Sequence, residues 1–269
     1  MPTRRVGFNA PAEQLANNYI EKLALPETAD LAATLRALPT GQLLAAMGER
    51  DRFTPIVDGR VLPDQPGRLF ATGRQQKVPY MTGGNSWEAS LGRRIGGGFS
   101  PAFAAKLVPV VDQARLYPGL SGEALDDAIF GDLVILSQSR FLANQMCALQ
   151  APVYAYYFSW VAEDRRARQP GAAHADDIAF VMGTLDAETD LSRVTAQDQA
   201  ISRLMTGYWL QFARSGNPNN PDAPDWPVYE PGSAQVLEIG AEVEVRNGFL
   251  AERMAYHLKR GQEMLGHSR

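Results

Sequence analysis

Cysteine is almost absent from this sequence of 269 residues, which contains a single one, Cys147. One cysteine cannot form an internal disulfide, and it is too few for a metal site built on thiolates. Cys147 lies within an apolar pattern of helical period, so we expect a buried and unreactive thiol. Cysteine usage therefore leaves the redox compartment of the protein undecided.

Long apolar runs are absent as well. No stretch approaches the roughly 20 apolar residues that a membrane-spanning helix needs. The chain has a basic start at Arg4 and Arg5, but no apolar stretch of secretory-signal length follows. We therefore expect no membrane as partner and no signal peptide on this chain. Localisation stays open, because residues upstream of the chain could carry a signal of their own.

An excess of charge of one sign is also missing. The chain has 26 lysines and arginines against 30 aspartates and glutamates, a net charge of −4. So weak a field gives no reason to expect nucleic acid as a partner. The hydrophobic content of 45% is enough for a sizeable core and excludes a disordered chain.

Hydrophobic periodicity divides the chain into helices and short strands. Within 11–50, apolar residues recur at spacings of three and four, and Asp58-Gly59 predicts a tight turn. The pattern predicts strands at 78–82, 153–158 and 236–239, and helices over 121–149, over a segment ending at Gly216, and from about Gly248. The basic and then glycine-rich stretch 91–100 predicts a surface loop. A long helix before strand 153–158 favours a parallel sheet, so we expect one α/β domain over 1–269, or part of one.

Three histidines are present: His174, His257 and His267. His257 stands beside Lys259 and Arg260 in the predicted C-terminal helix, and His267 lies in a polar tail, so we expect both to be solvated. His174 lies in a loop that follows a strand and leads into an apolar segment. A loop held by a rigid scaffold is a common place for a general base, although a structural histidine is an equal alternative.

Glu88 has a parallel setting, just past the carboxyl end of predicted strand 78–82. In open α/β sheets the functional crevice lies at those strand ends. A lone glutamate in a loop is ordinarily a solvated charge. Neither Glu88 nor His174 is identified as a site residue by its own setting. The two become candidates only together, as parts of a wider sequence pattern.

That pattern consists of short elements spread along most of the chain. In chain order they are Pro55-Ile56-Val57-Asp58-Gly59, Val78-Pro79, Gly84-Asn85 with Glu88, Asp132, Pro152-Val153-Tyr154-Ala155-Tyr156, Gly171-Ala172-Ala173-His174, Phe180-Val181-Met182-Gly183, Phe212-Ala213-Arg214-Ser215-Gly216-Asn217-Pro218-Asn219 and Trp226-Pro227-Val228-Tyr229. Their order and spacing resemble the type-B carboxylesterase family, which includes bacterial esterases and the cholinesterases, from about residue 12 to 260.

The resemblance implies an α/β-hydrolase fold, of which this chain is the C-terminal half: a mostly parallel sheet with flanking helices. It implies that Glu88 is the acid and His174 the general base of a Ser–Glu–His triad, which follow the serine in that order. Histidine would take the proton of the serine hydroxyl, and the carboxylate would fix the tautomer of the imidazole. The implied substrate is a small, apolar carboxylic ester, with no cofactor and no metal. One departure is Asp177, where the family often has glutamate.

The serine itself is missing. No G-x-S-x-G elbow occurs in the chain, and no serine precedes Ser86. Gly96-Gly97-Gly98 follows the acid, whereas the family's glycine-rich oxyanion loop precedes the serine, so we expect an ordinary loop there. We therefore expect the N-terminal part of the fold to lie outside this chain, either lost from a truncated or split gene or supplied by a partner chain.

Two other interpretations stay open. Some relatives of this family lack a working triad and serve as adhesion modules, so the chain could be a non-catalytic interaction module or an inactive fragment. A different α/β-hydrolase, such as a peptidase or a lipase, is the second alternative. The elements at Asn217-Pro218 and Trp226-Pro227 favour type B over it.

Overall fold

The structure, a computed structural model, describes residues 4–5, 11–25, 30–48, 53–96, 100–187 and 193–267. The chain forms two compact units, Met1–Arg74 and Gln75–Arg269. The single domain over 1–269 that the sequence suggests stays a prediction.

The first unit is mainly helical. Its helices are α1 (Ala12–Leu23), α2 (Leu31–Ala37), α3 (Thr40–Ala46) and α4 (Pro66–Ala71), and β1 (Arg4–Arg5) pairs antiparallel with β2 (Ile56–Val57). The Tyr19 hydroxyl donates to the carbonyl of Leu43 at 2.6 Å, which joins α1 to α3. The short helices predicted within 11–50 are confirmed.

The predicted turn at Asp58-Gly59 is confirmed. Asp58 Oδ1 accepts hydrogen bonds from the backbone N–H groups of Arg60, Val61 and Leu62. Gly59 has a φ of +75°, a conformation that glycine adopts without steric cost.

The second unit contains a four-stranded sheet in the order β3-β4-β5-β6. Strands β3 (Tyr80–Asn85), β4 (Val153–Phe158) and β5 (Val236–Ile239) are parallel, and β6 (Val243–Arg246) runs antiparallel to β5. The predicted strands 153–158 and 236–239 are confirmed at their bounds. The α/β fold class is confirmed too, whereas β6 was not predicted.

Strand β3 extends past its predicted end. The sequence predicts that this strand ends at residue 82, but Gly83 and Gly84 also lie within it, where Gly83 pairs with Tyr156 of β4. A Cβ atom at Gly83 would lie 2.4 Å from the Tyr156 ring and 2.4 Å from its carbonyl oxygen. The glycine therefore permits close strand packing rather than a turn.

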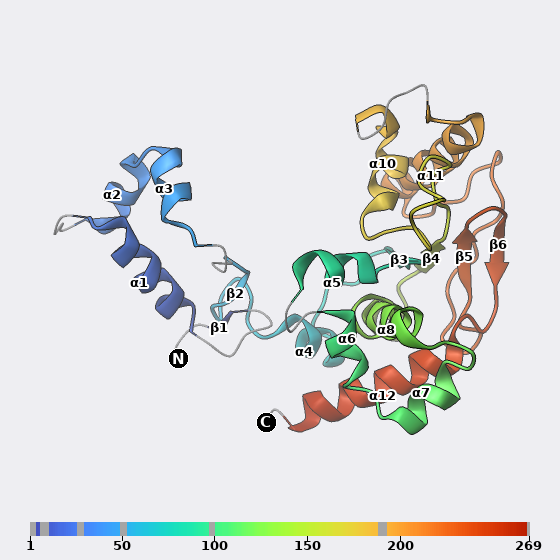
Figure 1. Cartoon of the computed structure of the whole chain (residues 1–269), viewed down its shortest axis with the longest axis horizontal. Coiled ribbons are helices and arrows are strands. Elements are labelled where there is room, and N and C mark those ends of the chain that lie inside the picture. Colours follow the sequence, from blue (N-terminus) through green and yellow to red (C-terminus); the bar gives the residue numbers. More distant parts are fainter. Residues whose placement is uncertain are drawn as a thin grey trace. The chain divides into compact units, whose positions relative to one another are not determined.

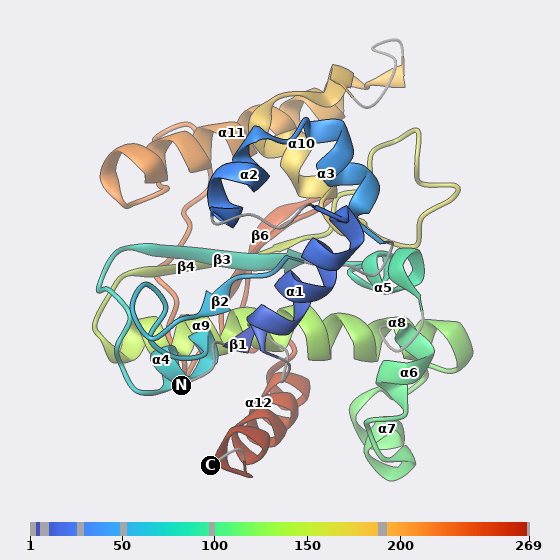
Figure 2. The same cartoon turned by 90° about the vertical axis from the view of Figure 1, so that its left-hand side faces the viewer.

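Helices cover both faces of this sheet (Figures 1 and 2). On one face lie α8 (Gly122–Gly131), a π-helical turn (Asp132–Leu136), α9 (Ser137–Ala148) and α12 (Ala251–His267); on the other lie α10 (Asp176–Met182) and α11 (Ala196–Ser215). The helix predicted over 121–149 is thus confirmed, with a π-helical turn in its middle. Ser121 is its N-cap residue, but the Ser121 side chain makes no capping hydrogen bond. Smaller elements are α5 (Ala89–Ile95), α6 (Pro101–Ala105), α7 (Val110–Leu116) and the 3₁₀ turn Leu185–Ala187.

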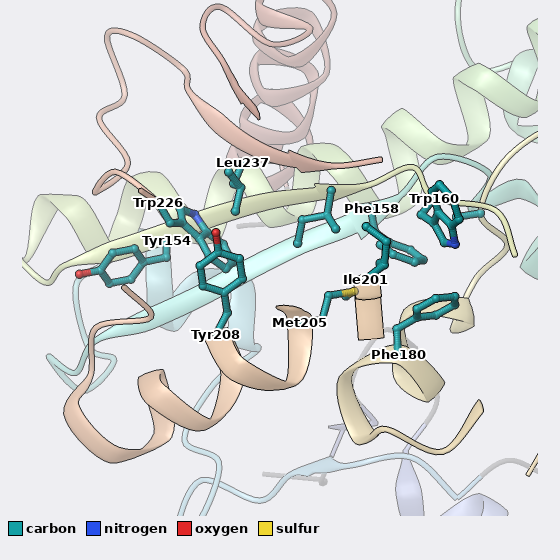
Figure 3. Close-up of a cluster of buried hydrophobic side chains, with 11 residues drawn as sticks. Tyr154, Phe158, Trp160, Phe180, Ile201, Met205, Tyr208, Trp226 and Leu237 are labelled. Atoms are coloured by element: carbon teal, nitrogen blue, oxygen red, sulfur yellow. The ribbon is translucent and has the colours of Figure 1, made fainter. Parts of the chain in front are cut away.

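The main core lies between the sheet and α11. Figure 3 shows Ile201, Met205 and Tyr208 of α11 pointing toward the strands. Trp226, which follows α11, is 1% exposed and donates its indole N–H to the Ala155 carbonyl at 3.0 Å. Asn219 bonds both the backbone N–H and the carbonyl of Trp226. The motifs around Asn219 and Trp226 therefore fix Trp226 in the core between the sheet and α11.

The stretch 91–100, predicted as a loop, begins as helix α5. Arg93 on this helix forms ion pairs with Asp127 and Glu123 of α8, which hold it in place. Gly96 ends the helix at a φ of +69°, and Gly97 and Gly98 lie outside the described residues. The loop prediction was wrong for 91–95, because charge pairing with a distant segment is not visible in local composition.

His257 is not solvated, contrary to our expectation. Its side chain is 3% exposed, and its Nε2 lies 2.8 Å from the Tyr117 hydroxyl. The same hydroxyl bonds Asp132, which pairs with Arg253 of α12. Neighbouring basic residues suggested an exposed helix face, but His257 follows Met254 by three positions on the face that packs inward. The side chain of His267 lies outside the described residues.

Cys147 is partly buried in α9. Its thiol lies 3.5 Å from the Tyr229 carbonyl, and burial raises the pKa of the thiol above its ordinary value. A raised pKa leaves less reactive thiolate at neutral pH, in line with an inert cysteine.

Candidate active site

Glu88 lies at the carboxyl end of β3, where it precedes the first turn of α5. Its side chain is only 4% exposed. Trp87 fixes this loop on one side, because its indole N–H donates to Asp127 of α8 at 2.7 Å. The loop after β3 therefore carries a buried carboxylate on a rigid support.

His174 lies in the segment between β4 and α10, and β4 is the strand next to β3. Its loop is joined to the Glu88 loop by backbone contacts. The Trp87 N–H donates to the Ala172 carbonyl at 2.8 Å, and Trp87 forms a parallel bridge with Ala173. Gly171 favours this approach, since a Cβ there would lie 2.7 Å from Ser86 Oγ and displace that hydroxyl.

The two serines beside Glu88 also hold the histidine loop. Ser86 Oγ accepts from the Ala172 N–H at 2.8 Å, and Ser90 Oγ accepts from the His174 N–H at 2.8 Å. Both hydroxyl oxygens thus bind backbone on the side of the histidine loop. Their positions explain why serines flank Glu88 without the glycines of a nucleophile elbow.

The structure brings the two predicted site residues into direct contact. His174 Nδ1 lies 2.5 Å from Glu88 Oε2. The acid is buried, whereas the histidine side chain is 33% exposed, so the pair reaches from the interior toward the surface. When Nδ1 donates to a carboxylate, Nε2 keeps its lone pair and can accept a proton from another group.

Burial raises the pKa of the Glu88 carboxyl above its ordinary value. The Asn85 N–H, which donates to Glu88 Oε1 at 2.7 Å, and His174 both oppose this shift. The nearby carboxylate of Asp177 adds to it. The charge on Glu88 therefore depends on the two donors that meet its two oxygens.

Asn85 and Asp177 belong to the same cluster, and the sequence did not identify either as a site residue. Asn85 was known only as part of the family pattern, and Asp177 as a departure from it. The Asn85 amide donates to Asp177 Oδ1 at 3.0 Å and to the Ala173 carbonyl at 2.7 Å. The signal that could have found Asn85 is a polar residue that ends a buried strand three positions before the acid.

The described residues contain no group of three or more histidine, cysteine, aspartate or glutamate side chains that could hold a metal ion. None of the described helices is long and apolar enough to cross a membrane.

The chain is similar to known carboxylesterases in sequence and in fold. A model of the Carboxylesterase family matches residues 120–257. The chain is 27% identical to the pyrethroid hydrolase Ces2a of Mus musculus over 252 residues, which cover 84% of this chain and 45% of that protein. It is 25% identical to the cocaine esterase of Homo sapiens over 288 aligned residues, 94% of this chain and 50% of that protein.

Solved structures share the fold. Two structures of a PNB esterase superpose with TM-scores of 0.66 and 0.69 at 24% and 23% identity, and each match covers 92% of this chain and 54% of the other. The chain thus spans about half the length of the relatives it matches. With the family model covering residues 120–257, the chain belongs to the carboxylesterase family.

Proposed function

We propose that this chain supplies the acid, Glu88, and the general base, His174, of a Ser–Glu–His ester hydrolase. The observation that carries the proposal is the 2.5 Å contact between Glu88 Oε2 and His174 Nδ1 at the carboxyl ends of two adjacent parallel strands. His174 takes the proton from a serine hydroxyl as that oxygen attacks the ester carbonyl, and returns it to the leaving alcohol. Glu88 holds the imidazole in the tautomer that has Nε2 free and stabilises its cationic form.

The serine and the oxyanion donors come from residues outside these 269, because no G-x-S-x-G element occurs in the chain. Strand β3 offers a place for them. Among the described residues of its unit, β3 pairs only with β4, so one edge is open to another strand. A segment paired there would end beside Glu88.

Small carboxylic esters of apolar acids are the proposed substrates. Relatives named for cleaving pyrethroids and for acting on cocaine support an ester as the reacting group. The direct test is hydrolysis of a short-chain p-nitrophenyl ester by the purified chain. The reference is the double variant Glu88→Gln, His174→Ala, measured in parallel.

We expect no turnover above the double variant from the chain alone. A mixture with a serine-bearing N-terminal half of a PNB esterase is expected to hydrolyse the ester, with rates that depend on Glu88 and His174. Turnover by the chain alone that disappears in the double variant would contradict the proposal, because it would reveal a nucleophile within these residues.

The second candidate is a non-catalytic carboxylesterase-like module. The lack of a G-x-S-x-G element favours it. A chain that folds cooperatively, and that gives no turnover in the serine-bearing mixture although the two parts bind each other, would support this alternative.

A further inference from the structure

One buried asparagine touches both loops of the candidate site. Asn85 is 3% exposed and ends β3, three residues before Glu88. Its backbone N–H donates to Glu88 Oε1 at 2.7 Å. Its side-chain amide donates across to the histidine loop, at 2.7 Å to the carbonyl of Ala173, the residue before His174.

The second N–H of that amide has its own partner. Asn85 Nδ2 lies 3.0 Å from Asp177 Oδ1, and Asp177 Oδ2 accepts from the Tyr156 hydroxyl of β4 at 3.1 Å. An amide nitrogen has two protons, and both are used here. The side chain of Asn85 is therefore held in one orientation by an acceptor that is itself anchored to the neighbouring strand.

Each carboxylate oxygen of Glu88 therefore accepts a hydrogen bond from a different donor. Oε1 receives the Asn85 N–H, and Oε2 receives His174 Nδ1. With one oxygen fixed, the plane of the carboxylate and the direction of the other oxygen are fixed as well. The Asn85 amide sets the position of the histidine backbone relative to the same strand end.

We propose that Asn85 is a positioning residue that ties the acid loop to the histidine loop, so that this chain assembles the Glu88–His174 pair before any serine is present. The inference rests on the proposed function for its catalytic meaning, but the assembled pair is a property of this chain alone. Without the amide, the Ala173 carbonyl keeps only the Asp176 N–H of its own turn. The histidine loop then loses its tie to the end of β3, and its remaining contacts with Ser86, Trp87 and Ser90 allow it to shift. A displacement of about 1 Å at a catalytic group can cost about 10²-fold in rate.

The test is proton NMR of the purified chain. A proton held between an imidazole nitrogen and a carboxylate in a short hydrogen bond gives a far-downfield resonance. Glu88→Gln and His174→Gln assign the signal by removing it. Asn85→Ala is then compared with the matched control Asn144→Ala, which loses a side-chain hydrogen bond to Tyr229 between α9 and the segment before β5.

We expect the resonance in the unsubstituted chain and in Asn144→Ala, and its loss or exchange broadening in folded Asn85→Ala. Asp177→Ala removes the anchor of the amide, so it is expected to weaken the signal in the same way if Asn85→Ala does not fold. An undiminished resonance in folded Asn85→Ala, or in Asp177→Ala when only that variant folds, would overturn the proposal, and so would its absence from the unsubstituted chain.

In an enzyme assembled with a serine-bearing part, Asn85→Ala is expected to lower kcat by about 10²-fold with little change in KM. A rate that falls equally in Asn144→Ala would reduce the role of Asn85 to stability and overturn the positioning role. Lack of activity in every assembly, with the resonance still dependent on Asn85, would remove the proposed function and leave the assembled pair in place.

Discussion

Tyr117 and His257 meet in the interior of the second unit, with 2.8 Å between the Tyr117 hydroxyl and His257 Nε2. The hydroxyl also bonds Asp132 at 2.8 Å, so its single proton serves the carboxylate and Nε2–H donates to the phenol oxygen. His257 Nδ1 is buried and has no hydrogen-bond partner. Burial, with Arg253 and Arg260 nearby, lowers the pKa of His257 to about 4.

A neutral His257 predicts a stability that falls on acidification. The unfolded chain binds the imidazole proton at about pH 6.5 and the folded chain only at about pH 4, so the unfolded state gains protons first as pH falls between them. The loss is complete below about pH 4 and is on the order of 3 kcal/mol. Urea unfolding between pH 4 and 7 measures it.

The matched variant is His257→Gln, which removes the titrating group. Its free energy of unfolding is expected to vary less over the same range, and the difference between the two curves isolates His257 from carboxyl groups whose raised pKa values act in the opposite direction. Parallel curves for the two proteins would contradict the assignment.

The ion pair beside this cluster joins α12 to the π-helical turn. Arg253 Nε lies 2.5 Å from Asp132 Oδ2, and Asp132 is 1% exposed. Arg253→Met leaves a buried carboxylate without its cation, which typically costs about 3–5 kcal/mol. The control is Arg246→Met, because Arg246 is half exposed and its pair with Glu238 is screened by solvent, so its loss is expected to change stability little. If chemical denaturation showed that the two variants lose the same free energy of unfolding, burial of the carboxylate would not determine the cost of removing its cation.

Gly83 is predicted to tolerate no side chain. Gly83→Ala places a Cβ atom 2.4 Å from the Tyr156 carbonyl oxygen of the paired strand, so backbone must move. Overpacking of this kind costs typically about 1–3 kcal/mol. Gly232→Ala is the control, since a Cβ there meets nothing within 4 Å. Thermal unfolding compares the stability of the two variants. If Gly83→Ala were as stable as Gly232→Ala, β3 and β4 could move apart to accept a methyl group without cost, and the prediction would be wrong.

Glu88→Gln is the sharpest test of catalysis in an assembled enzyme. The amide fills the same space, but it no longer fixes the tautomer of His174, a change that lowers kcat by about 10⁴-fold in a serine protease triad. Glu242→Gln, on an exposed residue in the turn before β6, is expected to leave kcat unchanged. Similar rates for Glu88→Gln and the unsubstituted enzyme would exclude Glu88 as the triad acid.

The sequence alone predicted the fold class and strand β4 at its bounds, and the family resemblance singled out Glu88 and His174. The β-branched and aromatic run 153–158 is strongly biased toward a strand, and the ordered motifs carried the family resemblance. Local pattern also marked Asp58-Gly59 as a turn, since a side chain and a glycine suffice to form it. For β4 and for the turn at Asp58-Gly59, the deciding interactions lie within a few residues of one another.

Tertiary structure decided what each residue packs against. The extension of β3 through Gly83 depends on Tyr156, and the burial of His257 depends on Tyr117, which is 140 positions away. The side-chain contacts of Asn85 depend on residues 88 and 92 positions further along the chain. Periodicity shows which face of a helix or strand turns inward, but the partner on that face is set by long-range packing that no local pattern encodes.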